Sequence, residues 1–215
     1  MIRLMLQEVK NMPPGFWAWF GDSVLVNPDG SPVQLYHGTQ TAFNAFRLSQ
    51  YGKYGPGIYL TGSPENAAGY AMGSRHETDG SGSVMPLYVR LENPLTIIAQ
   101  EDGSNRIKTR SGHLTPGHAE LQDRMSTVKG AVNTTSSPDF MQLVKSLGHD
   151  GIIVDFSDSF TPEMLDDLDT DIVIEEFLQH LRLGEVVVFS PTQIKSAISN
   201  VGSWSKDDED ISLEQ

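Results

Sequence analysis

Apolar residues fall mostly in short runs along the chain, separated by turns rich in glycine, proline and asparagine. This pattern predicts strands, which we expect over residues 23–26, 32–36, 58–60, 85–91, 151–154 and 185–189. Helical periodicity is rarer, and it predicts helices over residues 2–10, 64–72, 138–147 and 170–182. Many short strands with few helices between them favour an α+β fold over a doubly wound parallel sheet.

Three local segments refine this picture. The aromatic segment 16–20 (Phe-Trp-Ala-Trp-Phe) is expected to be core or a packing lid. The segment 27–30 (Asn-Pro-Asp-Gly) predicts a turn between two strands, which places His37 at the end of the second strand. The stretch 100–137 is polar and rich in serine, threonine and glycine, so we expect it to run over the surface, with one helix over 117–129.

The net charge of −13 is concentrated in two segments. Residues 156–184 contribute −7 and residues 200–215 contribute −4, so the rest of the chain is nearly neutral. A nucleic-acid-binding protein is expected to show a basic patch instead. The acidic segments are either solvated faces that aid solubility or a surface for a basic acceptor or partner.

The chain contains no cysteine, which excludes disulfides, thiolate ligands and a cysteine nucleophile. His113 and His118 are five positions apart with no ligand pattern to complete them, so we expect both on the surface and predict no metal. No segment approaches the roughly 20 apolar residues of a membrane span. The N-terminus lacks the features of a cleavable signal peptide. We expect a cytoplasmic protein, or one delivered into a target cell by a specialised secretion system or a phage.

Two short motifs, a tyrosine and a glutamate carry the candidate chemistry. Segment 35–39 reads Leu-Tyr-His-Gly-Thr, segment 57–61 reads Gly-Ile-Tyr-Leu-Thr, and Tyr70 follows eleven positions after Tyr59. Glu185 opens a late apolar run. Each of these residues alone is more often structural than functional. Together, in this order and spacing, they resemble the His-Tyr-Glu signature of the PARP-like and diphtheria-toxin-like ADP-ribosyltransferases, which cleave NAD at the nicotinamide–ribose bond.

The resemblance extends to the flanking segments 20–32 and 189–197, which look like those of the ADP-ribosyltransferase domains of phage polyvalent proteins and related bacterial toxins. It implies the ADP-ribosyltransferase fold, in which two facing, mostly antiparallel β-sheets with flanking helices form an NAD cleft. We expect one such domain over residues 1–200. Its expected insertions, and an acidic C-terminal tail that we expect to be flexible, cover residues 100–137, 156–183 and 201–215.

The resemblance assigns NAD as the substrate and implies catalytic roles for Glu185, His37 and Tyr59. Glu185 would hold the nicotinamide ribose and stabilise the positive charge that develops on it. His37 would bond to a ribose hydroxyl of the adenosine half, and the main chain of Gly38 would bond to the nicotinamide amide. Tyr59 and Tyr70 would stack on the nicotinamide ring. Such a site needs a carboxylate near the sugar, because the transition state resembles an oxocarbenium ion.

Further NAD contacts are expected from Thr39, which completes the His-Gly-Ser/Thr motif, and from Arg47. Arg47 and Lys53 would reach the pyrophosphate.

The chain departs at two positions from the families that it resembles. Ala67 lies three residues before Tyr70, where PARP-like members place a serine that bonds to the nicotinamide amide. Thr61 or Ser63 would have to replace that contact. Leu183 stands two positions before the catalytic glutamate, where arginine-specific toxins carry Glu or Gln, which disfavours arginine modification by that route.

Three functions are consistent with these residues. The leading one is mono-ADP-ribosylation of a macromolecular acceptor, a protein with a basic surface in preference to a nucleic acid, by a bacterial or phage toxin or effector. Such a protein would have an immunity or antitoxin partner. The alternatives are an NAD glycohydrolase, which uses water as the acceptor, and a non-catalytic module that binds NAD or a partner.

Overall fold

The computed structural model describes residues 12–41, 43–72, 82–126, 138–161, 163–164, 174–198, 200 and 204–211. The helix expected over residues 2–10 lies outside them. The chain divides into two compact units. The first unit consists of residues 1–47, 64–92 and 190–215, and the second consists of residues 48–63 and 93–189. Within the described ranges, no helix is long and apolar enough to cross a membrane.

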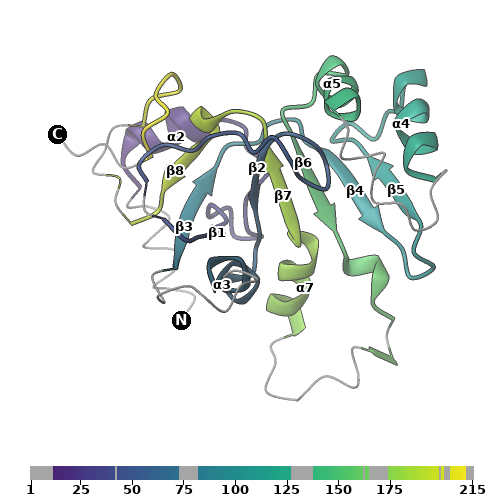
Figure 1. Ribbon diagram of the computed structural model, residues 1–215, viewed down its shortest axis with the longest axis horizontal. Coiled ribbons are helices and arrows are strands. Elements are labelled where there is room, and N and C mark those ends of the chain that lie inside the picture. Colours follow the sequence, from purple (N-terminus) through teal and green to yellow (C-terminus); the bar gives the residue numbers. More distant parts are fainter. Residues whose placement is uncertain are drawn as a thin grey trace. The chain divides into compact units, whose positions relative to one another are not determined.

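The first unit is built on an antiparallel sheet with the strand order β1-β3-β8 (Figure 1). Its strands and helices are α2 (Pro14–Phe20), β1 (Leu35–Thr39), α3 (Pro64–Met72), β3 (Ser83–Val89), the 3-10 helix η2 (Pro191–Gln193) and β8 (Ile194–Ser196). Helix α3 has the bounds that the sequence predicts, and it packs against β1. Helix α3 also contacts β3, so it covers two of the three strands.

The aromatic segment forms helix α2, and its expected place in the core is confirmed. Pro14 occupies the first turn, where its missing N–H costs nothing. Phe16, Trp19 and Phe20 are buried, and the helix ends at Gly21, whose φ of 56° favours glycine. Trp204 packs edge-on against Phe16, with ring centroids 4.8 Å apart.

The expected pair of strands around the turn at residues 27–30 is wrong. The turn forms, but its flanks meet only in an isolated bridge between Val26 and Pro32. The physical reason is that residues 23–24 bond to the end of β3 and the residues after it. The Ser23 hydroxyl donates to Val89 O and accepts from Leu91 N–H. Strand β1 consequently begins at Leu35, and His37 lies in its middle instead of at its end.

The second unit contains a five-stranded sheet in the order β2-β7-β6-β4-β5, and all neighbours are antiparallel except β4 and β6 (Figure 1). Its elements are β2 (Ile58–Leu60), β4 (Leu95–Ala99), β5 (Asn105–Lys108), α4 (Pro116–Ser126), α5 (Pro138–Ser146), β6 (Gly151–Asp155), the 3-10 helix η1 (Ser157–Ser159), α7 (Ile174–Arg182) and β7 (Glu185–Val188). The two mostly antiparallel sheets and their helices confirm the predicted α+β class.

The polar stretch after residue 100 contributes to the core of the second unit. Ile107 on β5 and Leu121 and Met125 on α4 belong to the same buried cluster as Phe140 of α5. The Gln122 side chain bonds to two main-chain groups of β5, accepting from Ile107 N–H at 2.9 Å. Strands β4 and β5 were not predicted, and the expectation of a surface excursion is wrong for residues 100–126.

The expectation that His118 lies on the surface is also wrong, whereas His113 is exposed. His118 Nε2 lies 2.9 Å from His149 Nε2 in the interior of the second unit. Thr115 N–H donates to His118 Nδ1 at 3.1 Å, so Nε2 carries the proton of the neutral ring. His149 Nδ1 lies 3.0 Å from the carbonyl oxygen of Asn93. The two rings therefore belong to one chain of hydrogen bonds, to which α4 contributes His118.

The C-terminal segment differs from the expected flexible tail over its described residues 204–211. Ile211 is buried, its N–H donates to Asn44 O at 2.8 Å, and its carbonyl oxygen accepts from Ser196 N–H at 2.9 Å. Main-chain groups at the end of this acidic segment are bound within the first unit, which composition alone does not reveal.

Candidate functional site

Strand β7 places Glu185 at its first position, opposite Val154 of β6. Two residues later Val187 lies opposite Tyr59 of β2 and Ile152 of β6. Because directly paired residues and alternate residues of a strand share a face, Glu185 and Tyr59 lie on the same face of the sheet. That face also carries the buried cluster, so Glu185 stands at the edge of a hydrophobic core.

The turn that leads into Glu185 is held from two sides. Gly62 N–H donates to Leu183 O at 2.7 Å, and Phe156 N–H donates to Leu181 O at 2.9 Å. Gly184 has no room for a side chain, because a Cβ there would meet the Phe156 ring. The carboxylate of Glu185 is thus carried on a backbone that its neighbours fix.

The environment of Glu185 is only partly solvated. Burial raises the pKa of the Glu185 carboxyl above its ordinary value, and the positive charge of Lys53 opposes the rise. Lys53 also lies 5.2 Å from the centre of the Tyr54 ring and 5.9 Å from that of Phe156. Burial and the charge of Glu185 both raise the pKa of Tyr54. A half-buried carboxylate with a nearby cation has a pKa that its surroundings shift, as is common at functional sites.

The hydroxyl of Tyr59 organises the loop before β2. It accepts from Tyr54 N–H at 3.0 Å and donates to Gly55 O at 2.6 Å. A Cβ at Gly52 would meet this hydroxyl, so the loop closes around it only because glycine stands there. Burial is the main reason that the pKa of Tyr59 rises to about 12. Tyr59 is therefore a neutral phenol with a structural role, and its ring packs at the edge of the core.

In the first unit, His37 lies on β1 opposite Met85 of β3. Two aromatic rings that the sequence analysis did not single out stand beside it. The Phe46 ring lies 5.0 Å from the imidazole centroid and nearly perpendicular to it, and the Phe43 ring lies at 6.2 Å. Phe43 and Phe46 also contact each other, with centroids 4.7 Å apart. We call Phe43 and Phe46 the His37 cradle.

Gly38 is required by packing. A Cβ at this position would meet Ala67 O and would lie 2.8 Å from Ala71 N, both main-chain atoms of α3. Ala67 is 1% exposed, so its methyl group fills the contact between α3 and β1. Thr39 closes the strand, since its hydroxyl donates to Thr41 O at 2.9 Å and accepts from Thr41 N–H.

Two predicted contacts lie on the surface. Tyr70 on α3 is 72% exposed, which leaves its ring available to stack on a ligand. Arg47 is also exposed. Thr61 and Ser63, the expected substitutes for the missing serine, are buried, and the Thr61 hydroxyl accepts from Ser63 N–H at 3.2 Å.

Comparison with known families gives one match. The family model described as ADP-ribosyltransferase in polyvalent proteins matches residues 27–204. The chain belongs to this family. Neither a comparison with curated proteins nor one with solved structures finds a significant match. The match bears out the resemblance to the ADP-ribosyltransferases of polyvalent proteins and assigns the α+β arrangement to the ADP-ribosyltransferase fold.

The family match covers candidate residues of both units. The matched range includes His37, Tyr59, Tyr70 and Glu185 and ends at Trp204. Family members use NAD as a substrate. Among the described residues, no group of three or more His, Asp or Glu side chains is placed to hold a metal ion.

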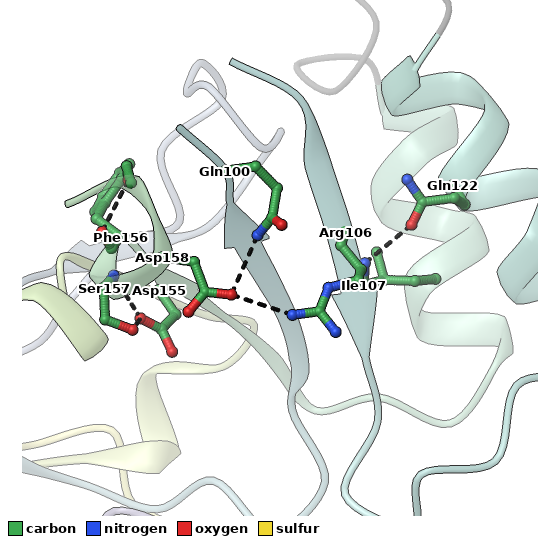
Figure 2. A network of polar contacts seen from close by, with 9 residues as sticks. Gln100, Arg106, Ile107, Gln122, Asp155, Phe156, Ser157 and Asp158 are labelled. Atoms are coloured by element: carbon green, nitrogen blue, oxygen red, sulfur yellow. Dashed lines mark hydrogen bonds and ion pairs between the residues drawn. The ribbon is translucent and has the colours of Figure 1, made fainter. Parts of the chain in front are cut away.

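The acidic stretch that precedes Glu185 begins in a structured way. Asp158 of η1 accepts from Arg106 Nη2 at 3.1 Å and from Gln100 Nε2 at 3.3 Å, which ties η1 to the strand ends of the sheet (Figure 2). The Asp155 side chain accepts from Ser157 N–H and from the Ser157 hydroxyl, which turns the chain into η1 (Figure 2). Asp158, the first acid of the stretch, is therefore paired within the protein. Three others, Asp166, Asp167 and Asp169, lie outside the described residues.

Proposed function

We propose that this chain transfers the ADP-ribose group of NAD to a macromolecular acceptor, a protein in preference to a nucleic acid, and releases nicotinamide. Membership in the family supports the reaction class. The observation that carries the proposal is Glu185, a half-buried carboxylate that shares a sheet face with Tyr59 at the edge of the core. A carboxylate of this kind can stabilise a developing positive charge better than one in bulk water.

In the proposed reaction, the bond between the nicotinamide ring nitrogen and C1′ of its ribose breaks. The electron pair of that bond goes to the nicotinamide, which leaves as a neutral molecule, and the sugar acquires oxocarbenium character. Ionised Glu185 stabilises this positive charge. A nucleophilic atom of the acceptor then forms a bond to C1′ and loses its proton to solvent. Lys53 supports the ionised form of Glu185, because its charge opposes the effect of burial.

The remaining NAD contacts are proposed for residues with different kinds of support. His37, held against its aromatic cradle, is proposed to bond to the adenosine ribose, and the exposed Tyr70 to stack on nicotinamide. Gly38 and Ala67 already have packing roles, so their proposed contacts with NAD use main-chain atoms. Thr39 and Arg47 complete the set through the hydroxyl of the last residue of β1 and an exposed cation.

The acceptor is proposed to be a protein with a basic surface. The support is charge: residues 156–184, which lead up to Glu185, contribute −7 to the net charge of −13. Opposite charge steers a basic partner toward such a surface. The family description mentions polyvalent proteins, and a role as a toxin or effector of bacterial or phage origin, with an immunity or antitoxin partner and delivery into a target cell, is part of this proposal.

The test is the fate of the ADP-ribose group. Purified protein is incubated with NAD labelled in the adenosine half, with and without cell lysate, and wild type is compared with Glu185→Ala. Label that becomes bound to protein in a Glu185-dependent way supports the proposal. Free ADP-ribose alone indicates a glycohydrolase. NAD that binds without turnover indicates the non-catalytic module, a function that the packing roles of Gly38 and Tyr59 also allow.

A further inference from the structure

A buried lysine outside the residues discussed so far anchors the C-terminal segment. Lys195 lies on β8 opposite Tyr88 of β3, and it is 0% exposed. Its Nζ donates to two main-chain carbonyl oxygens, those of Asp208 at 2.9 Å and Asp210 at 2.6 Å. Burial lowers the pKa of Lys195, and the charges of Asp208 and Asp210 oppose this effect. Burying an ammonium group is costly unless it is hydrogen-bonded. The two bonds offset that cost only when the carbonyl groups of Asp208 and Asp210 stay beside Lys195.

The segment held in this way lies between β8 and residues 44–45. We call residues 208–211 the strap. On one side Ser196 N–H of β8 donates to Ile211 O at 2.9 Å, and on the other side Ile211 N–H donates to Asn44 O at 2.8 Å. Next to this bond, Asp210 forms an isolated antiparallel bridge with Ala45. The strap therefore links the edge of the sheet to residues 44–45, and its residue Ile211 is buried, with 2% of its surface exposed.

Residues 44–45 are the backbone between the two rings of the His37 cradle. Phe43 precedes them and Phe46 follows them, and both rings contact the imidazole of His37. The segment 43–46 contains no strand or helix of its own, so neighbouring chain must fix it. The strap supplies that support through the Asn44 carbonyl and the bridge at Ala45.

We propose that Lys195 is a positioning residue: it holds the strap, the strap holds residues 44–45, and these hold the cradle that orients His37 for NAD. The inference rests on the proposed function, because it gives His37 a part in NAD binding. The whole strap lies beyond the range that matches the family, which ends at residue 204. The chain thus binds NAD well only when its own C-terminal segment is in place.

The first experiment separates NAD affinity from turnover. Lys195→Met removes the ammonium while keeping a long apolar side chain, and Lys206→Met removes the same charge from an exposed position of the same segment. In Lys195→Met we expect KM for NAD to rise about tenfold with kcat retained, the change for a cradle that is correctly placed about one-tenth of the time. Lys206→Met should behave as wild type. An unchanged KM in Lys195→Met overturns the proposal.

The second experiment restores the strap by another bond. Residues paired in an antiparallel bridge have a separation that suits a disulfide, and the natural chain has no cysteine to compete. Ala45→Cys and Asp210→Cys are therefore combined with Lys195→Met. The oxidised protein should recover the wild-type KM, and reduction should abolish the recovery. A fall in kcat that accompanies the rise in KM, and that oxidation does not reverse, indicates a merely structural lysine and overturns the proposal.

A third readout needs no NAD. The imidazole C–H resonance of His37, assigned by its disappearance in His37→Gln, should move in Lys195→Met and return in the oxidised double-cysteine variant. If the wild-type protein neither binds nor cleaves NAD, the proposed function fails, while this resonance still reports whether the strap positions His37. A resonance that stays at its wild-type position in Lys195→Met overturns the positioning role itself.

Discussion

Gly38 offers the sharpest test of how the first unit is built, because an alanine there has to displace a helix. The added Cβ would meet Ala67 O and lie 2.8 Å from Ala71 N. An ordinary contact needs ~3.5 Å, so α3 must move away from β1 by at least ~0.7 Å. Main-chain atoms cannot rotate aside as a flexible side chain would. We expect Gly38→Ala to lower the free energy of unfolding by about 1–3 kcal/mol, the usual range for overpacking.

Gly69→Ala on the same helix is the matched control. A Cβ at Gly69 meets nothing within 4 Å, and alanine is favoured over glycine in a helix interior by about 1 kcal/mol. The two alanine variants should therefore change stability in opposite directions. Urea denaturation followed by circular dichroism measures both changes in the free energy of unfolding. Thermal melts report them as well, since for a chain of this length the melting temperature shifts by roughly 2–4 °C per kcal/mol. A Gly38→Ala protein as stable as wild type would refute the packing role and leave NAD contact as the reason for glycine.

Three further predictions concern charge. Burial lowers the pKa of His118 below 6.5, so the free energy of unfolding should fall as the pH drops below that value. Urea denaturation between pH 8 and pH 5 should show a smaller fall for His118→Gln, and an equal fall in both proteins would contradict this. Lys53→Met should raise the pKa of Glu185 and move the acidic limb of the nicotinamide-release profile to higher pH, whereas an unmoved limb means that Lys53 does not act on this carboxylate. Neutralising three acids of the stretch before Glu185 should weaken acceptor labelling and spare NAD hydrolysis, and equal loss of both would remove its role in acceptor choice; these acids are Asp166, Asp167 and Asp169.

Local signals in the sequence were sufficient for several elements. The helix over residues 64–72 has a proline in its first turn, and its bounds were predicted. The strand that starts at Glu185 follows a glycine and reads as a continuous apolar run, which is typical of a buried strand, so its start was predicted as well. The order and spacing of His37, Tyr59 and Glu185 indicated the family. In each case the information lies within a few residues of the element itself.

What the sequence did not reveal depends on partners far along the chain. Strand β5 reads as polar, and only its pairing with β4 and the Gln122 bonds from α4 make it part of a sheet. His118 looked exposed because its partner, His149, is 31 positions away. The acidic C-terminal segment looked flexible because no residue near it in the sequence indicates that Lys195 binds its main chain. The packing roles of Gly38 and of the Tyr59 hydroxyl likewise require the folded neighbours.

The most direct test of the central claim is the rate of nicotinamide release from NAD by wild type and by Glu185→Gln, which keeps the shape of the side chain and removes its charge. Both proteins should have the same melting temperature, so that only the chemistry differs. If Glu185 stabilises the positive sugar, release by Glu185→Gln should be slower by about 10²-fold or more. Nicotinamide release at the wild-type rate by a folded Glu185→Gln protein would contradict the account.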